Sequence, residues 1–329
     1  MKKIFFAAFV LLIVMGFAAC SNKQVPVSTV NLQLQNSVDS LLKQGMGEYG
    51  ATEGMAIVVE TSTGNLRAMV GLKENNGKLV SDTTLFSKAR ETFLFRSASL
   101  LAALETGNVS LDDMFDTYAG IDVVGQDTIY DHNWRKGGYG ELTLLQGLAY
   151  NSSIAIDKAV DVAYQDKDVF LQKLEQMGLE KDSTFKGSWP LYALGFHHIK
   201  PVNFVSFFNA IANGGKMVSL KSQDSSAIVA DSMIAEKKNI ESMKKAFRFY
   251  VTNGLGKKAE SKMVNVAGTS GSIHTDDGIY ADFCGYFPVE KPKYTVFVSY
   301  KRPEIPVSGG GMAGQTFRKI AEQIMKTCK

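Results

Sequence analysis

The sequence predicts a mixed α/β (α+β) fold with one antiparallel sheet built from both ends of the chain. Two segments rich in β-branched and apolar residues lie near the start, and three lie near the end. The residues between these two groups show mainly helical periodicity. We therefore expect a five-stranded antiparallel sheet with helices on both faces and an inserted helical region. The strand-like segments are 55–60, 65–70, 263–268, 279–287 and 293–300.

The elements follow from local patterns. Apolar residues at helical spacing predict an amphipathic helix over 32–49, with Gly45 and Gly47 as its stop signals. The next two strands flank the tetrapeptide TSTG at 61–64, which predicts a hairpin. Helical periodicity returns later in the chain, at 144–163, 169–177, 202–212, 234–251 and 312–325.

A buried helix at 90–105, RETFLFRSASLLAALE, is the centre of the predicted fold. From Thr92 to Leu104 every residue except Arg96 is apolar or small, which indicates a helix buried on all faces. A guanidinium inside such a helix must meet a carboxylate, a carbonyl or a water-filled cleft. We therefore expect a site at its first turn, around Phe93 and Arg96, with a structural ion pair of Arg96 as the alternative.

The N-terminus has the pattern of an export signal. Lys2 and Lys3 precede an apolar run and the string FAAC, which ends at Cys20. This resembles a bacterial lipoprotein signal, so we expect a signal peptide at 1–19, a lipidated Cys20, a tether at 20–30 and one domain at 31–329. A plain transmembrane anchor is the alternative, although the apolar run is short for a membrane span.

Charge and cysteine content narrow the function classes. Removing residues 1–19 takes away two lysines, so 34 basic residues face 33 acidic ones. A net charge this close to zero gives no field toward nucleic acid. With Cys20 lipidated, only Cys284 and Cys328 remain, which excludes a disulfide framework. These two thiols could pair, but two free buried thiols are the simpler expectation.

The chain resembles the transpeptidase domain of penicillin-binding proteins, class B type. The strings that carry the resemblance run in the family's order from about residue 30 to residue 327. They are MAIVVETSTGNLRAMV, SLLAALETG, LAYNSSIA, AIANGGK, VAGTSGS, FCGYFPVEKPKYTVFV and GGGMAGQTFRKIAEQI. The resemblance implies the penicillin-binding protein/serine β-lactamase-like fold and a serine acyl-transfer site made of three elements: S-x-x-K, S-x-N and K-T-G.

All three elements depart from the family pattern here. The resemblance places Phe93 at the position of the nucleophilic serine and Arg96 at the position of the lysine base. Phenylalanine has no atom to acylate, and arginine stays protonated. The second element is Asn151-Ser152-Ser153, and the third is Thr269-Ser270-Gly271, which lacks the cation. We therefore expect no catalytic residue at the family positions.

Other serines offer alternative nucleophiles. Three S-x-x-K tetrads occur, and the middle one, Ser183 to Lys186, is STFK, a common form in the family, but it follows the second element in the chain. Ser152 or Ser153 with His274 as base is a second alternative. The outer two tetrads run from Ser40 to Lys43 and from Ser242 to Lys245.

The remaining polar groups have simpler interpretations. His197 and His198 lack a third ligand at a recognisable spacing, so we interpret them as surface or capping residues and expect no metal. Asp112, Asp113 and Asp116 are interpreted as a solvated loop. No cofactor is expected.

The sequence thus predicts a lipid-anchored, periplasm-facing protein of the cell envelope without acyl-transfer activity, with the outer membrane as a suitable destination. It would bind a peptidoglycan stem peptide or a cell-wall synthesis protein and no nucleic acid. The rivals are an active D,D-transpeptidase or carboxypeptidase with a displaced serine, and a scaffold whose cleft is plugged. The candidate ligand-binding residues are Arg96, Asn151, Ser153, Thr269, Ser270, Ser272 and His274.

Overall fold

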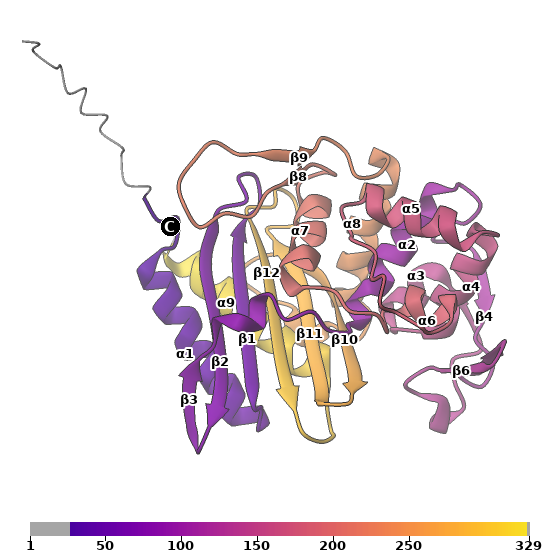
Figure 1. Cartoon of the computed structure of the whole chain (residues 1–329), viewed down its shortest axis with the longest axis horizontal. Coiled ribbons are helices and arrows are strands. Elements are labelled where there is room, and N and C mark those ends of the chain that lie inside the picture. The colour runs from indigo at the N-terminus through magenta and orange to yellow at the C-terminus, as the bar shows by residue number, and fades with distance from the viewer. Residues whose placement is uncertain (1–26, 328–329) are drawn as a thin grey trace, which may run out of the picture.

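The computed structural model in Figure 1 describes residues 27–327. Its main sheet has six antiparallel strands in the order β10-β11-β12-β1-β2-β3. The strands from the chain's end therefore lie beside those from its start, as predicted. The strands are β1 Glu53–Glu60, β2 Leu66–Asn75, β3 Lys78–Ser81, β10 Ala267–Thr275, β11 Gly278–Phe287 and β12 Tyr294–Arg302.

Helices cover both faces of the sheet (Figure 1). Most helices of the described chain, α2 to α8, come from the inserted region between β3 and β10. The helices are α1 Leu32–Tyr49, α2 Arg96–Glu105, α3 Leu144–Ala149, α4 Ser153–Ala163, α5 Lys167–Gln176, α6 Trp189–Leu194, α7 Pro201–Ala212, α8 Lys237–Thr252 and α9 Gly314–Thr327.

Short elements fill the connections. The single-turn helices are η1 Thr83–Phe86, η2 Phe93–Phe95, η3 Trp134–Lys136, η4 Lys257–Ala259 and the π-helical η5 Gly309–Ala313. Three small ribbons pair β4 Met114–Asp116 with β7 Glu141–Thr143, β5 Ile121–Val124 with β6 Asp127–Tyr130, and β8 Met217–Val218 with β9 Val229–Asp231.

The alternation of side chains along β1 explains why both faces are covered. Ile57 and Val59 belong to a core shared with α2 and α7, whereas Ala56 and Val58 belong to a core shared with α1 and α9. All four are fully buried, so this central strand has apolar residues on both faces. Helix α7 therefore rests on one face of the sheet, and the two terminal helices rest on the other. Helices α2 to α6 lie beyond the β10 edge of the sheet (Figure 1).

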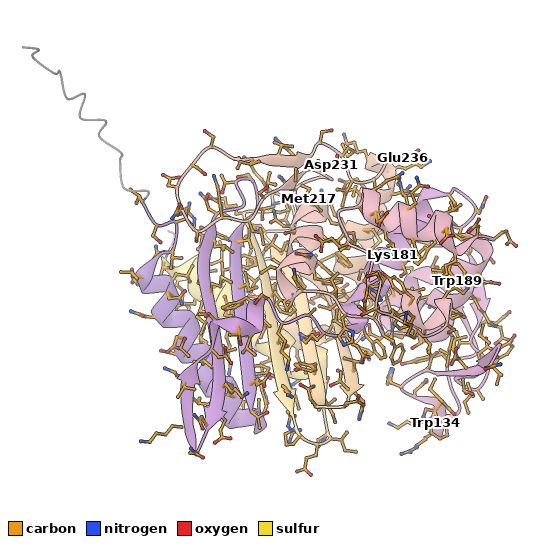
Figure 2. All side chains as sticks on the ribbon, viewed as in Figure 1. Trp134, Lys181, Trp189, Met217, Asp231 and Glu236 are labelled. Atoms are coloured by element: carbon orange, nitrogen blue, oxygen red, sulfur yellow. The ribbon has the colours of Figure 1, made fainter. Side chains whose placement is uncertain are left out.

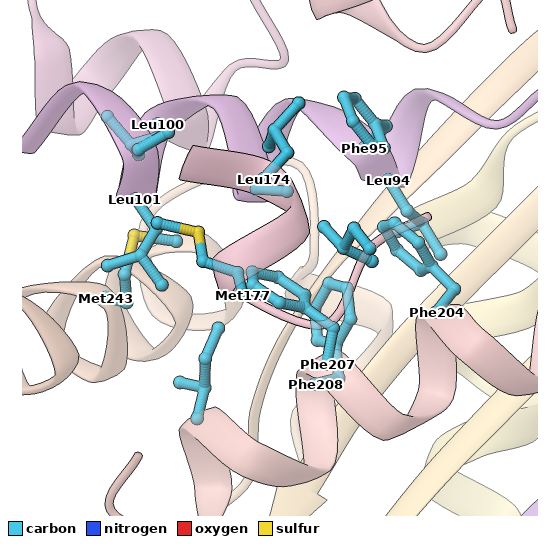
Figure 3. Packing of buried hydrophobic residues seen from close by; sticks show 14 of the residues in the cluster. Leu94, Phe95, Leu100, Leu101, Leu174, Met177, Phe204, Phe207, Phe208 and Met243 are labelled. Carbon is cyan, nitrogen blue, oxygen red and sulfur yellow. The ribbon is translucent and has the colours of Figure 1, made fainter. Parts of the chain in front are cut away.

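The buried helix predicted at the centre of the fold is present as η2 and α2. Every residue from Arg96 to Leu104 is buried. Figure 3 shows its apolar side chains packed among residues of α5, α7 and α8. The packing partners labelled there include Leu174, Met177, Phe204, Phe207, Phe208 and Met243.

Several predicted boundaries were wrong. The sheet has six strands instead of five, because β3 is a short, largely exposed edge strand without apolar alternation. The strand predicted at 263–268 lies at 267–275, where small and polar residues are buried as strand. The helix predicted at 144–163 is two helices, since Asn151 has a φ of 53° and ends the first of them. Helix α1 passes through Gly45 and Gly47 and ends at Tyr49, followed by the capping residue Gly50, whose φ is 63°.

The N-terminal predictions lie mostly outside the described residues, including the signal peptide, Cys20 and the first part of the tether. Within residues 27–30, Thr29 is buried, and its hydroxyl donates to the Leu66 carbonyl at 3.0 Å. Its backbone N–H bonds to Ser222 O at 2.9 Å. Over residues 27–327, no helix is both long enough and apolar enough to cross a membrane.

Candidate functional site

The site begins where the chain enters the buried helix. Thr92 is extended, with a φ of −158°, and its hydroxyl oxygen accepts a hydrogen bond from Leu94 N at 3.3 Å, which caps the turn of η2. Arg96 follows as the first residue of α2. A Cβ atom on Gly271 of β10 would lie 2.9 Å from Leu94 N and 3.0 Å from Phe93 Cβ. Glycine at this position therefore lets the helix start approach the edge strand closely.

A buried ion pair fixes this helix start to the sheet. Arg90 donates two parallel hydrogen bonds to Asp282 on β11, at 2.9 and 2.8 Å, and a third to Ser299 on β12 at 3.0 Å. The hydroxyl of Thr92 donates to the same Asp282 carboxylate at 2.8 Å. Burial alone would lower the pKa of Arg90, but the charge and hydrogen bonds of Asp282 raise it instead. The capping residue is thus held by the sheet.

Arg96 has a different environment, and the predicted alternative of a structural ion pair was wrong. Among the described residues, no carboxylate lies within ion-pairing distance of its guanidinium. Its Nη1 donates to the carbonyl of Asn151 at 2.9 Å, and its Cζ lies 3.8 Å from the centre of the Phe93 ring. Its Nε has no hydrogen-bond partner within residues 27–327. Burial lowers the pKa of Arg96 to about 10, which leaves it protonated at neutral pH.

The second element lies at the junction of α3 and α4. Asn151 occupies the left-handed region, and Ser152 caps α4 by accepting a hydrogen bond from Ala155 N at 3.0 Å. The fully buried Asp131 holds this turn, since its carboxylate accepts bonds from Ser152 Oγ and Ser153 N, both at 2.7 Å. Burial raises the pKa of Asp131 even though these hydrogen bonds act to lower it.

A tyrosine connects the second element to the third. The hydroxyl of Tyr250 on α8 shares a hydrogen bond with Ser270 on β10 and accepts one from Asn151 Nδ2 at 3.4 Å. Burial raises the pKa of Tyr250 to about 12, so its hydroxyl stays neutral. This neutral hydroxyl contacts residues of both elements and holds them together.

These three elements meet at one open cleft of about 390 Å³. Gly271 and Thr269 are not among its lining residues; Thr269 is buried, and its hydroxyl has no partner in the described part of the chain. The backbone N–H of Gly309, from the turn before α9, donates to Ser272 Oγ at 2.8 Å and closes one end. The predicted site residues that line the cleft are Phe93, Arg96, Asn151, Ser153, Ser270, Ser272 and His274.

The alternative nucleophiles have unsuitable surroundings. Ser183 is exposed in the loop between α5 and α6 and is not among the cleft residues. Ser152 Oγ is buried against Asp131. Ser153 lines the cleft together with His274, but its hydroxyl donates to the Tyr130 carbonyl at 3.2 Å.

Two of the remaining polar predictions were tested by the structure. His197 is a capping residue and not a surface residue, because its Nδ1 donates to the Tyr192 carbonyl in the last turn of α6 at 3.0 Å. It is fully buried and stacks on the Tyr192 ring at 3.8 Å, and burial lowers its pKa to about 4. His198 is exposed, and its backbone N–H donates to Asp182 at 2.9 Å. Asp112, Asp113 and Asp116 are exposed, as predicted, but Asp116 is the last residue of strand β4 and not a loop residue. Across residues 27–327, no cluster of His, Cys, Asp and Glu is suited to a metal ion.

Cys284 is buried and has no disulfide partner within residues 27–327, and burial raises its pKa well above the usual value. Cys328 lies outside the described residues.

The sequence analysis missed several residues that shape the cleft, among them Asp131, Tyr250 and Trp134. Asp131 and Tyr250 lie far from the motifs along the chain, and no local pattern marks them. Trp134 of η3, which is exposed and labelled in Figure 2, lines the cleft together with Tyr130. Their ring centres are 5.4 Å apart. The close spacing of Tyr130 and Trp134 in the sequence was the one signal that could have indicated this aromatic pair.

The sheet, the helices on its two faces and the three-sided cleft define the fold of penicillin-binding proteins and serine β-lactamases. The chain belongs to the penicillin-binding protein transpeptidase domain family, whose family model matches residues 54–325.

Solved structures agree with this fold. A peptidoglycan glycosyltransferase from Burkholderia ambifaria aligns with a TM-score of 0.79 and 18% identity over 92% of this chain and 98% of that one. The transpeptidase domain of penicillin-binding protein 3 from Burkholderia pseudomallei gives 0.78 and 18% over 93% and 97%. The transpeptidase domain of the FtsI4 D,D-transpeptidase from Legionella pneumophila gives 0.69 and 20% over 92% and 100%.

Proposed function

We propose that this protein binds the carboxylate end of a peptidoglycan stem peptide without covalent turnover, as a lipid-anchored, periplasm-facing protein of the cell envelope. Membership of the transpeptidase domain family supports the cell-wall context. The signal-like N-terminus with Cys20 supports the lipid anchor and export.

The observation that carries the binding role is the incompletely bonded guanidinium of Arg96 in an open cleft. Arginine forms bidentate, charge-assisted hydrogen bonds with carboxylates, and these strengthen where water is partly excluded. Arg96 is buried, protonated and without a carboxylate partner in the described structure. The open cleft beside it favours ligand binding over a plugged scaffold.

Phe93 and Arg96 both argue against acyl transfer. Phe93, at the start of η2, has no nucleophilic atom, and its ring packs on the guanidinium. Arg96 keeps its proton at neutral pH and cannot act as a general base. The neutral Tyr250 hydroxyl is engaged by Ser270 and Asn151.

The first test is covalent labelling. We expect no mass increase when the purified, folded protein is incubated with excess penicillin, because the Ser153 hydroxyl donates to the Tyr130 carbonyl and the Ser270 hydroxyl is bonded to the neutral Tyr250 hydroxyl. Intact-protein mass spectrometry makes the measurement, and circular dichroism verifies that the protein is folded. An active penicillin-binding protein in a parallel reaction verifies the reagent. An adduct of one drug molecule, mapped to Ser153 or Ser183, would establish the displaced-serine enzyme instead.

The second test addresses the carboxylate contact. Arg96→Gln is expected to weaken binding of a peptide ending in D-Ala-D-Ala by about tenfold to a hundredfold, the amount that a lost hydrogen bond to a charged group predicts. Isothermal titration calorimetry on the full-length protein measures this change. The matched control is Arg318→Gln on α9, which removes the same charge on the opposite face of the sheet.

Amidation of the peptide's C-terminus should reproduce the loss in the wild-type protein, since it removes the carboxylate instead of the guanidinium. Equal affinity of the wild-type and Arg96→Gln proteins for the free acid would refute the assignment of Arg96.

A further inference from the structure

A second cavity adjoins the cleft. It has a volume of about 240 Å³ and apolar walls from η2, β6, α6 with the loop after it, and β10. In Figure 1, the lobe that carries α6 and β6 lies on the β10 side of the sheet. The apolar residues that line this side pocket are Phe93, Ile129, Leu191, Leu194, Phe196 and Ile273.

The side pocket has rigid walls. Ile129, Leu194 and Ile273 are almost fully buried and belong to a strand or a helix. Phe93 and Phe196 meet edge to face, with ring centres 5.0 Å apart. Water inside such a pocket finds few hydrogen-bond partners, so an apolar group of matching size should replace it favourably.

The pocket and the cleft share a boundary. Phe93, Tyr130, Ser153 and His274 line both spaces. The Phe93 ring that forms part of the pocket wall also lies 3.8 Å from the guanidinium carbon of Arg96. The Phe93 ring thus lies between the Arg96 guanidinium and the side pocket. One ligand can reach both only if its carboxylate and its apolar group are close together.

We propose that the cleft is selective for peptides that carry a bulky apolar side chain within two residues of the terminal carboxylate, with that side chain in the side pocket. This inference rests on the proposed binding of a carboxylate by Arg96. It adds a specificity that two terminal alanines would not use, because a methyl group cannot fill a cavity of about 240 Å³.

The test compares three probes on the full-length protein by isothermal titration calorimetry: acetyl-D-Ala-D-Ala, acetyl-D-Ala-D-Phe and acetyl-D-Phe-D-Ala. At least one phenylalanine peptide is expected to bind about tenfold more tightly than the alanine peptide, in keeping with burial of one aromatic side chain. Leu191→Trp, which fills the pocket from a half-buried position, should abolish this ratio. Leu41→Trp, a half-buried leucine on α1, should keep it.

Thr128→Trp provides a second filling variant from an exposed position on β6, in case Leu191→Trp does not fold. Equal affinities for all three peptides would overturn the selectivity while leaving the proposed carboxylate binding intact. A tenfold ratio that survives in a folded filling variant would also overturn it, since the side chain would then lie elsewhere. Absence of binding by every peptide would refute the proposed function together with this inference.

Discussion

Replacing Arg90 with methionine is expected to lower the free energy of unfolding by about 3–5 kcal/mol, the usual cost of leaving a buried charge without its partner. Asp282 is 1% exposed, and its carboxylate receives bonds from Arg90, at 2.8 and 2.9 Å, and from Thr92. Without Arg90, that carboxylate would be left in the protein interior without its cationic partner. Urea denaturation at neutral pH, followed by circular dichroism, measures the loss.

The matched control is Lys88→Met, which removes a cation two residues earlier. Lys88 pairs with Asp277 at 3.1 Å, but both side chains are about half exposed. Exposed pairs contribute at most about 1 kcal/mol, so this variant should stay close to the wild type.

The double variant Arg90→Met with Asp282→Asn provides a further check. It carries no uncompensated charge, so it should be more stable than Arg90→Met alone. If the free energy of unfolding of Arg90→Met lies within about 1 kcal/mol of the wild-type value, the ion pair does not hold the helix start.

The parts of the fold that the sequence predicts well are those in which apolar periodicity and burial agree. The bounds of α1 match the predicted 32–49, and α2 is buried from Arg96 to Leu104 as its composition requires. Both patterns report on local backbone geometry and on which face leaves water. These patterns can therefore be interpreted without knowing which other elements pack against the helix.

The predicted bounds of the edge strand β10 were wrong for a physical reason. Residues 267–275, AGTSGSIHT, contain small and polar side chains, which are poor local signals for a strand. They form β10 because their backbone pairs with β11 in register from Ala267 to Thr275. The apolar string MVNVAG, on which the prediction was based, covers residues 263–268 and overlaps β10 only at Ala267 and Gly268. Ladder hydrogen bonds made in three dimensions outweighed the local preference.

The site was partly predictable. The resemblance to known motifs identified Phe93, Arg96 and Asn151, and the structure brings all three to one cleft. The resemblance carried no information on Tyr250 or Asp131, because their hydrogen bonds reach across long separations in the chain. Residues that reach the site from distant parts of the chain carry no motif of their own, so only the coordinates reveal them.

The break between α3 and α4 illustrates the same limit. The polar string Asn151-Ser152-Ser153 was visible inside an apolar periodic segment, and serine and asparagine favour helix caps and turns. Propensity alone left a continuous helix possible. The buried carboxylate of Asp131, which binds the Ser153 N–H and the Ser152 hydroxyl, favours the turn.

Asp157→Asn is expected to stabilise the protein at neutral and alkaline pH and to leave its stability nearly unchanged at acidic pH. Asp157 on α4 is 6% exposed. Burial, with the nearby charges of Asp161 and Asp122, raises its pKa to about 7, against a smaller opposing effect of Lys158. Asparagine has the same shape and never ionises.

The direction of the pH dependence follows from this pKa. In the folded protein the carboxyl holds its proton more tightly than in the unfolded chain, where its pKa is near the usual 3.8. The stabilisation that this neutral carboxyl provides is fully present below about pH 4 and is lost as the pH rises through about 7. At pH 8 the variant should therefore exceed the wild type by up to about 4 kcal/mol, at 1.36 kcal/mol per pKa unit.

Chemical denaturation of the wild type and the variant at several pH values between 5 and 8 measures this difference, which should widen as the pH rises. Asp161→Asn, one turn further along α4, provides the graded comparison. It removes a like charge that raises the pKa of Asp157, so the pKa of Asp157 should be lower in this variant than in the wild type. The stability of Asp161→Asn should therefore lie closer to that of Asp157→Asn at pH 8 than the wild-type stability does. A gap between the wild type and Asp157→Asn that is the same at pH 5 and pH 8 would show that Asp157 is already ionised in the folded protein at pH 5, and that solvent reaches its carboxylate.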